Sequence, residues 1–189
     1  MDLLSKLFIV CVVGLTGCAM DTEVSSRTTL SREGQGSADG VSYWDGDRVA
    51  GHPSIKIDLE SQRAYFYKGN QMVGVSIVST GREGYDTPPG EFRVVQKDVD
   101  HASSLYGDYV SRGGQVVERN VELGKDPRPR GAVFQGAPMP YFLRINGGIG
   151  MHAGYLPGYP ASHGCIRLPR AMAVKFFEDA PVGTPVVVR

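Results

Sequence analysis

Apolar and polar residues alternate in short runs along much of the chain, starting near residue 55. Ile55, Ile57 and Leu59 alternate with charged residues, a pattern typical of a half-buried β-strand. Residues 62–67 and 73–77 continue as two further strands, and three such strands in succession predict an antiparallel meander. The same reasoning predicts strands at 91–94, 141–145, 149–153 and 186–188.

One segment has the spacing of an amphipathic helix instead. Apolar residues follow that spacing from Ala173 to Ala180, which predicts a helix of roughly ten residues after Pro169. The 25 glycines and 12 prolines favour many turns. We therefore predict a mainly β fold with one short C-terminal helix.

The segment 98–138 has no strong pattern of its own. It carries several glycines and prolines, with one possible strand at 116–121. A long insertion of this kind is often a lid or a binding loop. The alternative is a decorated hairpin far from any site, and the sequence leaves both open.

The first residues form a separate segment. Lys6 gives a positive start, and residues 7–15 form an apolar run that is too short to cross a bilayer and suits a secretory signal peptide. Residues 15–18, Leu-Thr-Gly-Cys, resemble the lipobox of bacterial lipoproteins, which implies cleavage before Cys18 and lipid attachment to it. Ala19 resembles an outer-membrane sorting signal. The alternative is an ordinary signal peptide that ends in a chance cysteine.

Residues 19–50 are rich in Ser, Thr, Gly and Asp, a composition typical of a flexible tether. We expect a signal peptide at 1–17, a tether at 18–50 and one folded domain at 51–189. A chain of 189 residues suits one domain with appendages. The net charge of zero gives no electrostatic reason to expect a nucleic acid partner.

Cys165 is the cysteine that remains for the folded domain, because Cys11 lies in the expected signal peptide and Cys18 would carry the lipid. An unpaired cysteine in an exported protein is either reactive or a hazard. His152 and His163 lie near it in the sequence. A cysteine becomes a nucleophile when an imidazole takes its proton and backbone N–H groups hold the oxyanion. The pattern therefore predicts a cysteine acyl-transfer enzyme.

A zinc site built from His152, His163 and Cys165 is a rival interpretation, because all three are zinc-ligand types. It lacks a fourth ligand at a suitable spacing, so we expect no metal and no cofactor. For His52 and His101 we expect an ordinary structural role.

The run 162–167, Ser-His-Gly-Cys-Ile-Arg, preceded by His152, resembles the active-site signature of the YkuD-type L,D-transpeptidase catalytic domain. Residues 79–81 (Ser-Thr-Gly) and 87–92 (Thr-Pro-Pro-Gly-Glu-Phe) agree with it. The resemblance covers about residues 53–189. It implies a YkuD-like β-sandwich catalytic domain that remodels bacterial peptidoglycan, with 98–138 as a long lid-like insertion.

The resemblance also implies a mechanism. Cys165 attacks the L,D peptide bond of a tetrapeptide stem and releases D-alanine, and the acyl group passes to an amine of another stem. His152 is the proton acceptor and donor. Backbone N–H groups of His163, Gly164 and Cys165 form the oxyanion hole.

Two further residues of the run are assigned to the substrate-binding loop. Ser162 hydrogen-bonds within the turn, and Arg167 holds the loop or meets a substrate carboxylate, since a guanidinium suits either task. The segment 153–161 between His152 and Ser162 is shorter than in many members of the family, and Ala153 stands where glycine is common. We expect this to affect substrate preference rather than chemistry.

Other outcomes of the same site stay open. With water as the acceptor the enzyme is an L,D-carboxypeptidase, and a third interpretation is a non-catalytic wall-binding envelope lipoprotein. Lipid on Cys18 would anchor the protein at the outer membrane, with its catalytic domain in the periplasm. We expect a monomer whose partners are peptidoglycan stems and, through the lipid, a membrane.

Overall fold

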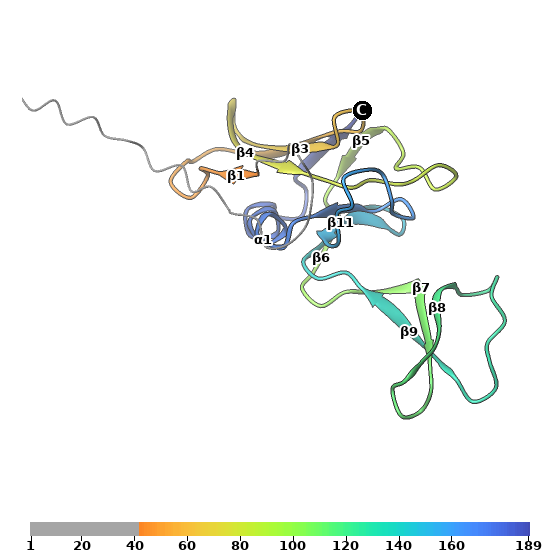
Figure 1. Cartoon of the computed structure of the whole chain (residues 1–189). Helices are drawn as coiled ribbons and strands as arrows, with labels where there is room; N and C mark the ends of the chain where they lie inside the picture. The colour runs from red at the N-terminus through yellow and green to blue at the C-terminus, as the bar shows by residue number, and fades with distance from the viewer. Residues whose placement is uncertain (1–41) are drawn as a thin grey trace, which may run out of the picture.

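The predicted meander forms half of a six-stranded sheet in the structure, a computed structural model that describes residues 42–189 (Figure 1). In order across the sheet, the strands are β1 (Tyr43–Trp44), β4 (Gln71–Ile77), β3 (Arg63–Lys68), β2 (Pro53–Asp58), β13 (Pro185–Val188) and β5 (Gly90–Arg93). β2, β3 and β4 pair antiparallel, as predicted. β13 enters between β2 and β5, parallel to β2 and antiparallel to β5.

A second sheet has four strands, in the order β12 (Ile166–Leu168), β11 (Ile149–Ala153), β10 (Phe142–Asn146) and β6 (Gln96–Asp98). β11 and β12 pair in parallel, and the other neighbours pair antiparallel. The predicted helix is confirmed as α1 (Arg170–Asp179), which packs on β11. Within the described residues, no helix has the length and apolar character needed to cross a membrane.

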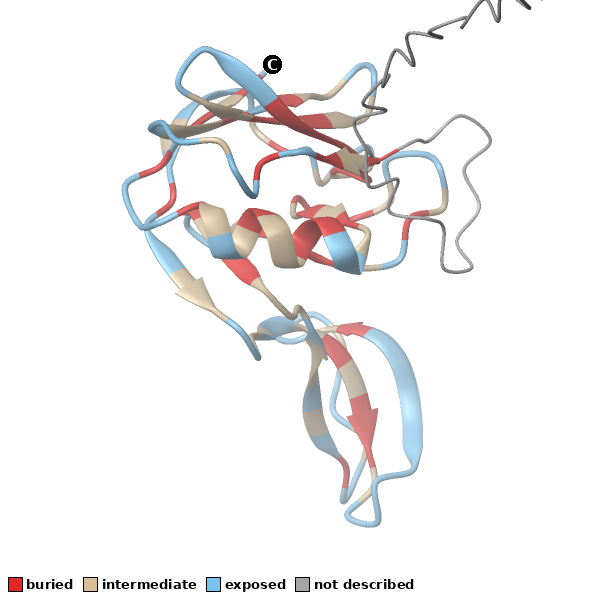
Figure 2. Cartoon of the chain, turned by 90° about the vertical axis from the view of Figure 1, so that its left-hand side faces the viewer, coloured by how far each residue is buried: buried red, intermediate tan, exposed pale blue. Residues whose placement is uncertain are grey.

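The main hydrophobic core lies between these two sheets, and α1 contributes to it (Figures 1 and 2). Strand alternation sends Ile55 and Ile57 of β2 inward. Leu143 and Met151 belong to the same core from the second sheet. The fold is therefore the mainly β sandwich that the sequence predicted.

Residues 42–50 pack against this core, whereas the sequence predicted a flexible tether as far as residue 50. Trp44 is 3% exposed, and its ring centroid lies 5.1 Å from that of Phe66 and 6.2 Å from that of Phe176. Burial of one large aromatic side chain stabilises an otherwise polar segment, an effect that composition does not reveal. The folded part therefore includes residues before 51. The rest of the predicted tether and the predicted signal peptide lie outside the described residues.

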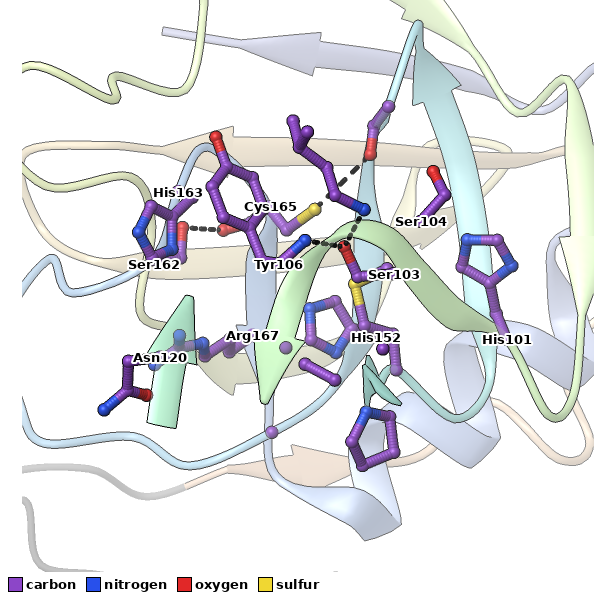
Figure 3. A pocket seen from close by; sticks show the side chains of 18 of the residues that line it. His101, Ser103, Ser104, Tyr106, Asn120, His152, Ser162, His163, Cys165 and Arg167 are labelled. Carbon is purple, nitrogen blue, oxygen red and sulfur yellow. Dashed lines mark hydrogen bonds between the residues drawn. The ribbon is translucent and has the colours of Figure 1, made fainter. Parts of the chain in front are cut away.

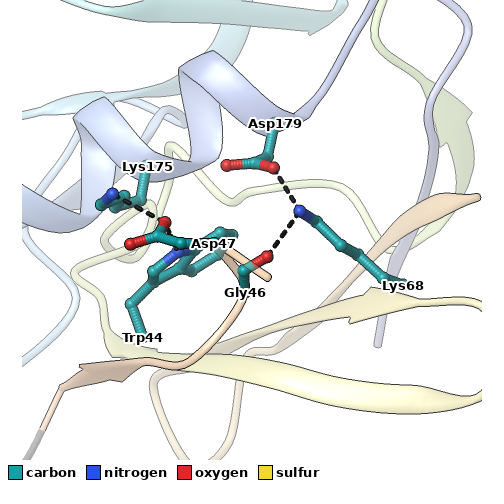
Figure 4. A network of polar contacts seen from close by, with 6 residues as sticks. All are labelled: Trp44, Gly46, Asp47, Lys68, Lys175 and Asp179. Carbon is teal, nitrogen blue, oxygen red and sulfur yellow. Dashed lines mark hydrogen bonds and ion pairs between the residues drawn. The ribbon is translucent and has the colours of Figure 1, made fainter. Parts of the chain in front are cut away.

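Polar contacts fix the same segment to the helix (Figure 4). Asp47 accepts a hydrogen bond from Trp44 Nε1 at 2.7 Å and pairs with Lys175 of α1 at 2.8 Å. Lys68 Nζ lies 2.5 Å from Asp179 Oδ1 at the end of α1. An acidic residue at a helix C-terminus opposes the helix dipole. The ammonium of Lys68 offsets that unfavourable placement.

The segment 98–138 contains a separate antiparallel sheet of β8 (Val116–Glu122), β7 (Ala102–Val110) and β9 (Val133–Pro138). We refer to it as the three-stranded sheet, and it projects from the sandwich in Figure 1. The strand predicted at 116–121 is confirmed by β8. β7 and β9 were not predicted, because much of this thin sheet is exposed and a clear alternation does not result.

Candidate active site

The pairing of β11 with β12 places His152 and Cys165 on the same face of the second sheet. Met151 lies beside Ile166 in this parallel pair, and both are buried in the core. Successive side chains of a strand point to opposite faces. His152, and Cys165 immediately before β12, therefore project away from the core.

A cavity of about 860 Å³ lies over that face (Figure 3). Its lining includes Ser162, His163, Cys165, Arg167 and His152, which the sequence singled out. The buried Gly164 lies in the same turn. Another wall of the cavity comes from the three-stranded sheet. This placement favours the lid or binding-loop interpretation of that segment over a distant hairpin.

The His152 ring is held in one tautomer. Its Nδ1 lies 2.9 Å from the carbonyl oxygen of Ala153, and because a carbonyl only accepts, Nδ1 carries the hydrogen. Burial lowers the pKa of His152 to about 4, the bond to Ala153 opposes this shift, and Arg167 adds to it. The imidazole is therefore neutral at neutral pH, with Nε2 able to accept a proton.

The Cys165 thiol is also held in its neutral form. Burial raises the pKa of the thiol, and the Gly150 backbone N–H and two arginines, Arg167 and Arg144, oppose the shift. Sγ lies 3.6 Å from the carbonyl oxygen of Gly148, a weak S–H···O contact (Figure 3). The site thus pairs a neutral thiol with a neutral imidazole rather than a thiolate with an imidazolium.

The turn 162–165 is fixed from within and by a neighbouring loop. Ser162 Oγ donates to the Cys165 carbonyl at 2.5 Å and accepts from the Gly164 N–H at 3.0 Å, as predicted for hydrogen bonding within the turn. Thr87 Oγ1 donates to the Gly164 carbonyl at 2.8 Å. Gly164 has a φ of +108°, a backbone angle that residues with a side chain rarely adopt.

These bonds change one expectation. The Gly164 N–H was expected in the oxyanion hole, but it already donates to Ser162. A backbone N–H offers one hydrogen, so Gly164 has none left for an oxyanion in this arrangement. The N–H groups of His163 and Cys165 remain as candidates.

His163 joins the turn to the three-stranded sheet. Its ring stacks on Tyr106 of β7 at a centroid distance of 4.1 Å and meets the edge of Tyr85 at 4.7 Å. Arg82 Nη2 donates to His163 Nε2 at 2.7 Å, so this nitrogen is unprotonated. Burial, and then the charge of Arg82, lower the pKa of His163. Sequence reasoning missed these three partners, since no local pattern marks contacts between segments so far apart.

Arg167 is placed at the cavity by its backbone. Its backbone N–H donates to the Ser79 carbonyl at 2.9 Å and its carbonyl accepts from the Ser79 N–H at 3.0 Å, which ties β12 to the first sheet's loop. Its side chain lines the cavity. A Cβ at Gly154 would lie 3.0 Å from Arg167 Cγ, so the glycine leaves room for this side chain.

The two remaining histidines differ in position. His52 is exposed. His101 Nδ1 lies 3.0 Å from Asp98 Oδ2, and the His101 ring stacks on Phe142 at a centroid distance of 4.3 Å. His101 also lines the cavity, so it has structural partners and lies at the site. Within residues 42–189, no group of three or more His, Cys, Asp or Glu side chains could hold a metal. The zinc alternative thus has no ligand set in the described part.

A family model and several known proteins match most of this chain. The family model described as the L,D-transpeptidase catalytic domain, YkuD, matches residues 52–188. The chain is 30% identical over 141 residues to the Bacillus subtilis protein YqjB, whose name assigns it to the L,D-transpeptidases, and the match covers 74% of this chain and 73% of YqjB.

Two further proteins are similar over part of their length. YbiS of Escherichia coli K12, named in the same way, is 31% identical over 142 residues, which cover 71% of this chain and 44% of YbiS. The crystal structure of an L,D-transpeptidase from Stackebrandtia nassauensis matches with a TM-score of 0.53 and 20% identity, covering 76% of this chain and 60% of that one. This chain therefore spans less than two thirds of both proteins, and the structural match concerns the fold.

Proposed function

The chain belongs to the family of YkuD L,D-transpeptidase catalytic domains, and on this premise we propose that it is a cysteine-dependent acyltransferase that cuts and rejoins peptidoglycan stem peptides. One observation carries the proposal. Cys165 and the neutral ring of His152 project from one sheet face into one cavity. A thiol with a neutral base at hand can attack an amide carbonyl.

The first half of the reaction acylates Cys165. His152 Nε2 takes the thiol proton as Sγ bonds to the carbonyl carbon of the L,D peptide bond in a tetrapeptide stem. The N–H groups of His163 and Cys165 donate to the oxyanion of the tetrahedral intermediate. When the C–N bond breaks, His152 passes its proton to the departing amine. Free D-alanine leaves, and the acyl part stays on Cys165 as a thioester.

The second half transfers the acyl group. An amine of another stem attacks the thioester carbonyl while His152 accepts its proton. Collapse of the tetrahedral intermediate expels the Cys165 thiolate, which recovers the proton from His152. Arg167 offers a cation for a carboxylate on the acyl part of the stem, and Ser162 keeps the turn in shape. Water in place of the amine would make the enzyme an L,D-carboxypeptidase.

Mass spectrometry of purified protein incubated with disaccharide-tetrapeptides tests the proposal. We expect a cross-linked dimer whose mass equals two substrates minus one D-alanine. Disaccharide-tripeptide alone would assign carboxypeptidase activity. If the substrates stayed unchanged while Cys165 remained open to iodoacetamide, transfer between stems would be excluded.

We also propose that Cys18 is lipidated and holds the catalytic domain in the periplasm, anchored at the outer membrane, as a monomer. The proposal rests on the resemblance of residues 15–18 to a lipobox and on the apolar run before them. Partition of the full-length protein into a detergent phase, lost on Cys18→Ala, would support it. Partition unaffected by that change would contradict it.

A further inference from the structure

Cys165 belongs to a row of neighbouring residues that runs across three strands of the second sheet. Met151 pairs with Ile166, so Gly150 and Cys165, each one position earlier, lie side by side. On its other side Gly150 pairs with Arg144 of β10. Paired residues share a face of the sheet. Cys165, Gly150 and Arg144 therefore form one row, and Arg144 lines the same cavity as Cys165.

Gly150 leaves the middle of this row without a side chain. Adjacent strands lie about 4.8 Å apart, so the backbones of Arg144 and Cys165 are separated by roughly 10 Å. A Cβ on Gly150 would meet the ring of Phe142 at 2.6 Å. The Phe142 ring therefore packs directly over the glycine, and Gly150 itself contributes no side chain between Cys165 and Arg144.

The guanidinium of Arg144 is held in place but keeps free donors. Its Nε donates to Gln96 Oε1 at 2.8 Å and its Nη1 donates to the Gly147 carbonyl at 2.6 Å. Its Cζ lies 5.0 Å from the centroid of Phe142. A guanidinium has five N–H donors, and these two bonds use two. Among residues 42–189 no carboxylate pairs with Arg144.

We propose that Arg144 binds the carboxylate of the leaving D-amino acid and so restricts the enzyme to stems in which one residue follows the scissile bond. This assignment rests on the proposed function. In such a stem the terminal carboxylate carbon lies about 4 Å from the scissile carbonyl carbon. A rigid guanidinium with free N–H groups suits a carboxylate better than any neutral group.

The other charges at the cavity fit this division of roles. Arg167 lies in the neighbouring row, beside His152 rather than beside Gly150. Asp108 also lines the cavity, but its Oδ1 accepts the Asn120 backbone N–H at 2.9 Å. A leaving residue that extends from Cys165 over Gly150 thus brings its carboxylate towards Arg144. A longer stem would place an uncharged amide there instead.

Steady-state rates with two substrates test the inference: a tetrapeptide stem ending in D-alanine, and the same stem ending in D-alaninamide. We expect the wild-type protein to prefer the free acid by roughly ten- to hundredfold in kcat/KM, the range for hydrogen bonds to a charged group. Arg144→Gln should lose that preference, because it lowers kcat/KM for the free acid and leaves kcat/KM for the amide unchanged. Arg144→Lys, which keeps the charge without the fork, should retain part of it.

Arg93→Gln is the matched control, because Arg93 lies on β5 and also donates to a backbone carbonyl, that of Gly183. It should keep the wild-type preference. If Arg144 only supported the Gly147 turn, Arg144→Gln would slow both substrates equally, and the inference would be overturned. Equal wild-type rates on both substrates would overturn it while the proposed function stood. If the wild-type protein reacted with neither substrate, both the proposed function and this inference would be overturned.

Discussion

The sandwich and the three-stranded sheet supply opposite sides of one cavity, yet they are built very differently. The sandwich buries side chains from two sheets and a helix in one core. The three-stranded sheet has a small core of Tyr109, Val121 and Ala132, with Phe134 packed against it. Several of its large apolar residues, such as Val117 at 53%, are exposed. Its strands therefore resist local opening less well.

The reacting groups stand on the better-packed side. His152 and Cys165 alternate with Met151 and Ile166, which are 1% and 0% exposed. The thinner sheet contributes Tyr106, which touches the site through His163. Chemistry needs atoms held within fractions of an ångström, whereas a wall that receives a peptide can tolerate movement. The comparison predicts that changes in the sandwich affect rate and that changes in the three-stranded sheet affect affinity.

The largest effect is expected for Cys165→Ala. The variant should show no turnover, because the Ser162 hydroxyl, which also lines the cavity, is engaged in a hydrogen bond to the Cys165 carbonyl. It should keep the circular dichroism spectrum and melting temperature of the wild type. Cys165→Ser should also be inactive, since a serine hydroxyl is a poorer nucleophile beside a base of low pKa. Turnover by the alanine variant, measured as D-alanine release, would disprove the mechanism.

His152→Ala should follow, with kcat reduced by about two to four orders of magnitude through loss of the general base. His163→Ala should reduce it less, because alanine preserves the backbone N–H at residue 163. Parallel measurements of kcat on one tetrapeptide decide the order. Equal losses, or the reverse order, would show that the base is wrongly assigned.

The pH dependence of kcat/KM should reflect the burial of His152. Because its pKa is lowered to about 4, the neutral base persists as the pH falls from 6.5 and is lost only near pH 4. At pH 5 the enzyme should be about thirtyfold more active than a histidine of ordinary pKa would allow. An acid limb near pH 6.5 would contradict the neutral pair.

Stability supplies the control for that experiment. The unfolded chain carries histidine of ordinary pKa and binds the proton between pH 6.5 and 4, whereas folded His152 does not. The free energy of unfolding therefore decreases as the pH falls through this interval. Circular dichroism at each pH separates unfolding from protonation of the base.

Tyr106→Ala should give the smallest effect and the most direct test of the comparison. Loss of its stacking on His163 should raise KM by roughly two- to tenfold, the value of one aromatic pair, with kcat nearly unchanged. Tyr65→Ala is a matched control, because Tyr65 lies on β3, outside the cavity lining. A fall in kcat without a change in KM would place Tyr106 with the chemistry instead.

Part of the sandwich could be predicted because some of its strands have one buried and one more exposed face. β2 alternates in sequence as it does in burial, whereas consecutive residues of β10 and β11 are buried. Two kinds of strand could not be predicted from the sequence. β12 has three residues and begins within the site motif 162–167, so it is too short to form a pattern. β7 and β9 lack a consistently buried face, so their alternation is weak.

The site also contains some residues that could be predicted from the sequence and some that could not. Cys165 and His152 could be selected because free thiols and imidazoles are rare and chemically distinctive, and strand ends can bring them together. Arg144 could not be selected, since an arginine on a strand normally indicates a solvated edge. Its place beside Gly150 depends on the pairing register of β10 with β11. The engagement of the Gly164 N–H likewise depends on the conformation of one turn.

The central position of β13 also determines when the chain can fold. β13 lies between β2 and β5, and its Val186 is fully buried, although about 130 residues separate it from β2 in the sequence. Pairings over such distances close large loops and slow folding. The chain therefore cannot complete its first sheet until residues 185–188 are available, and until then the edge of β2 that pairs with β13 stays open.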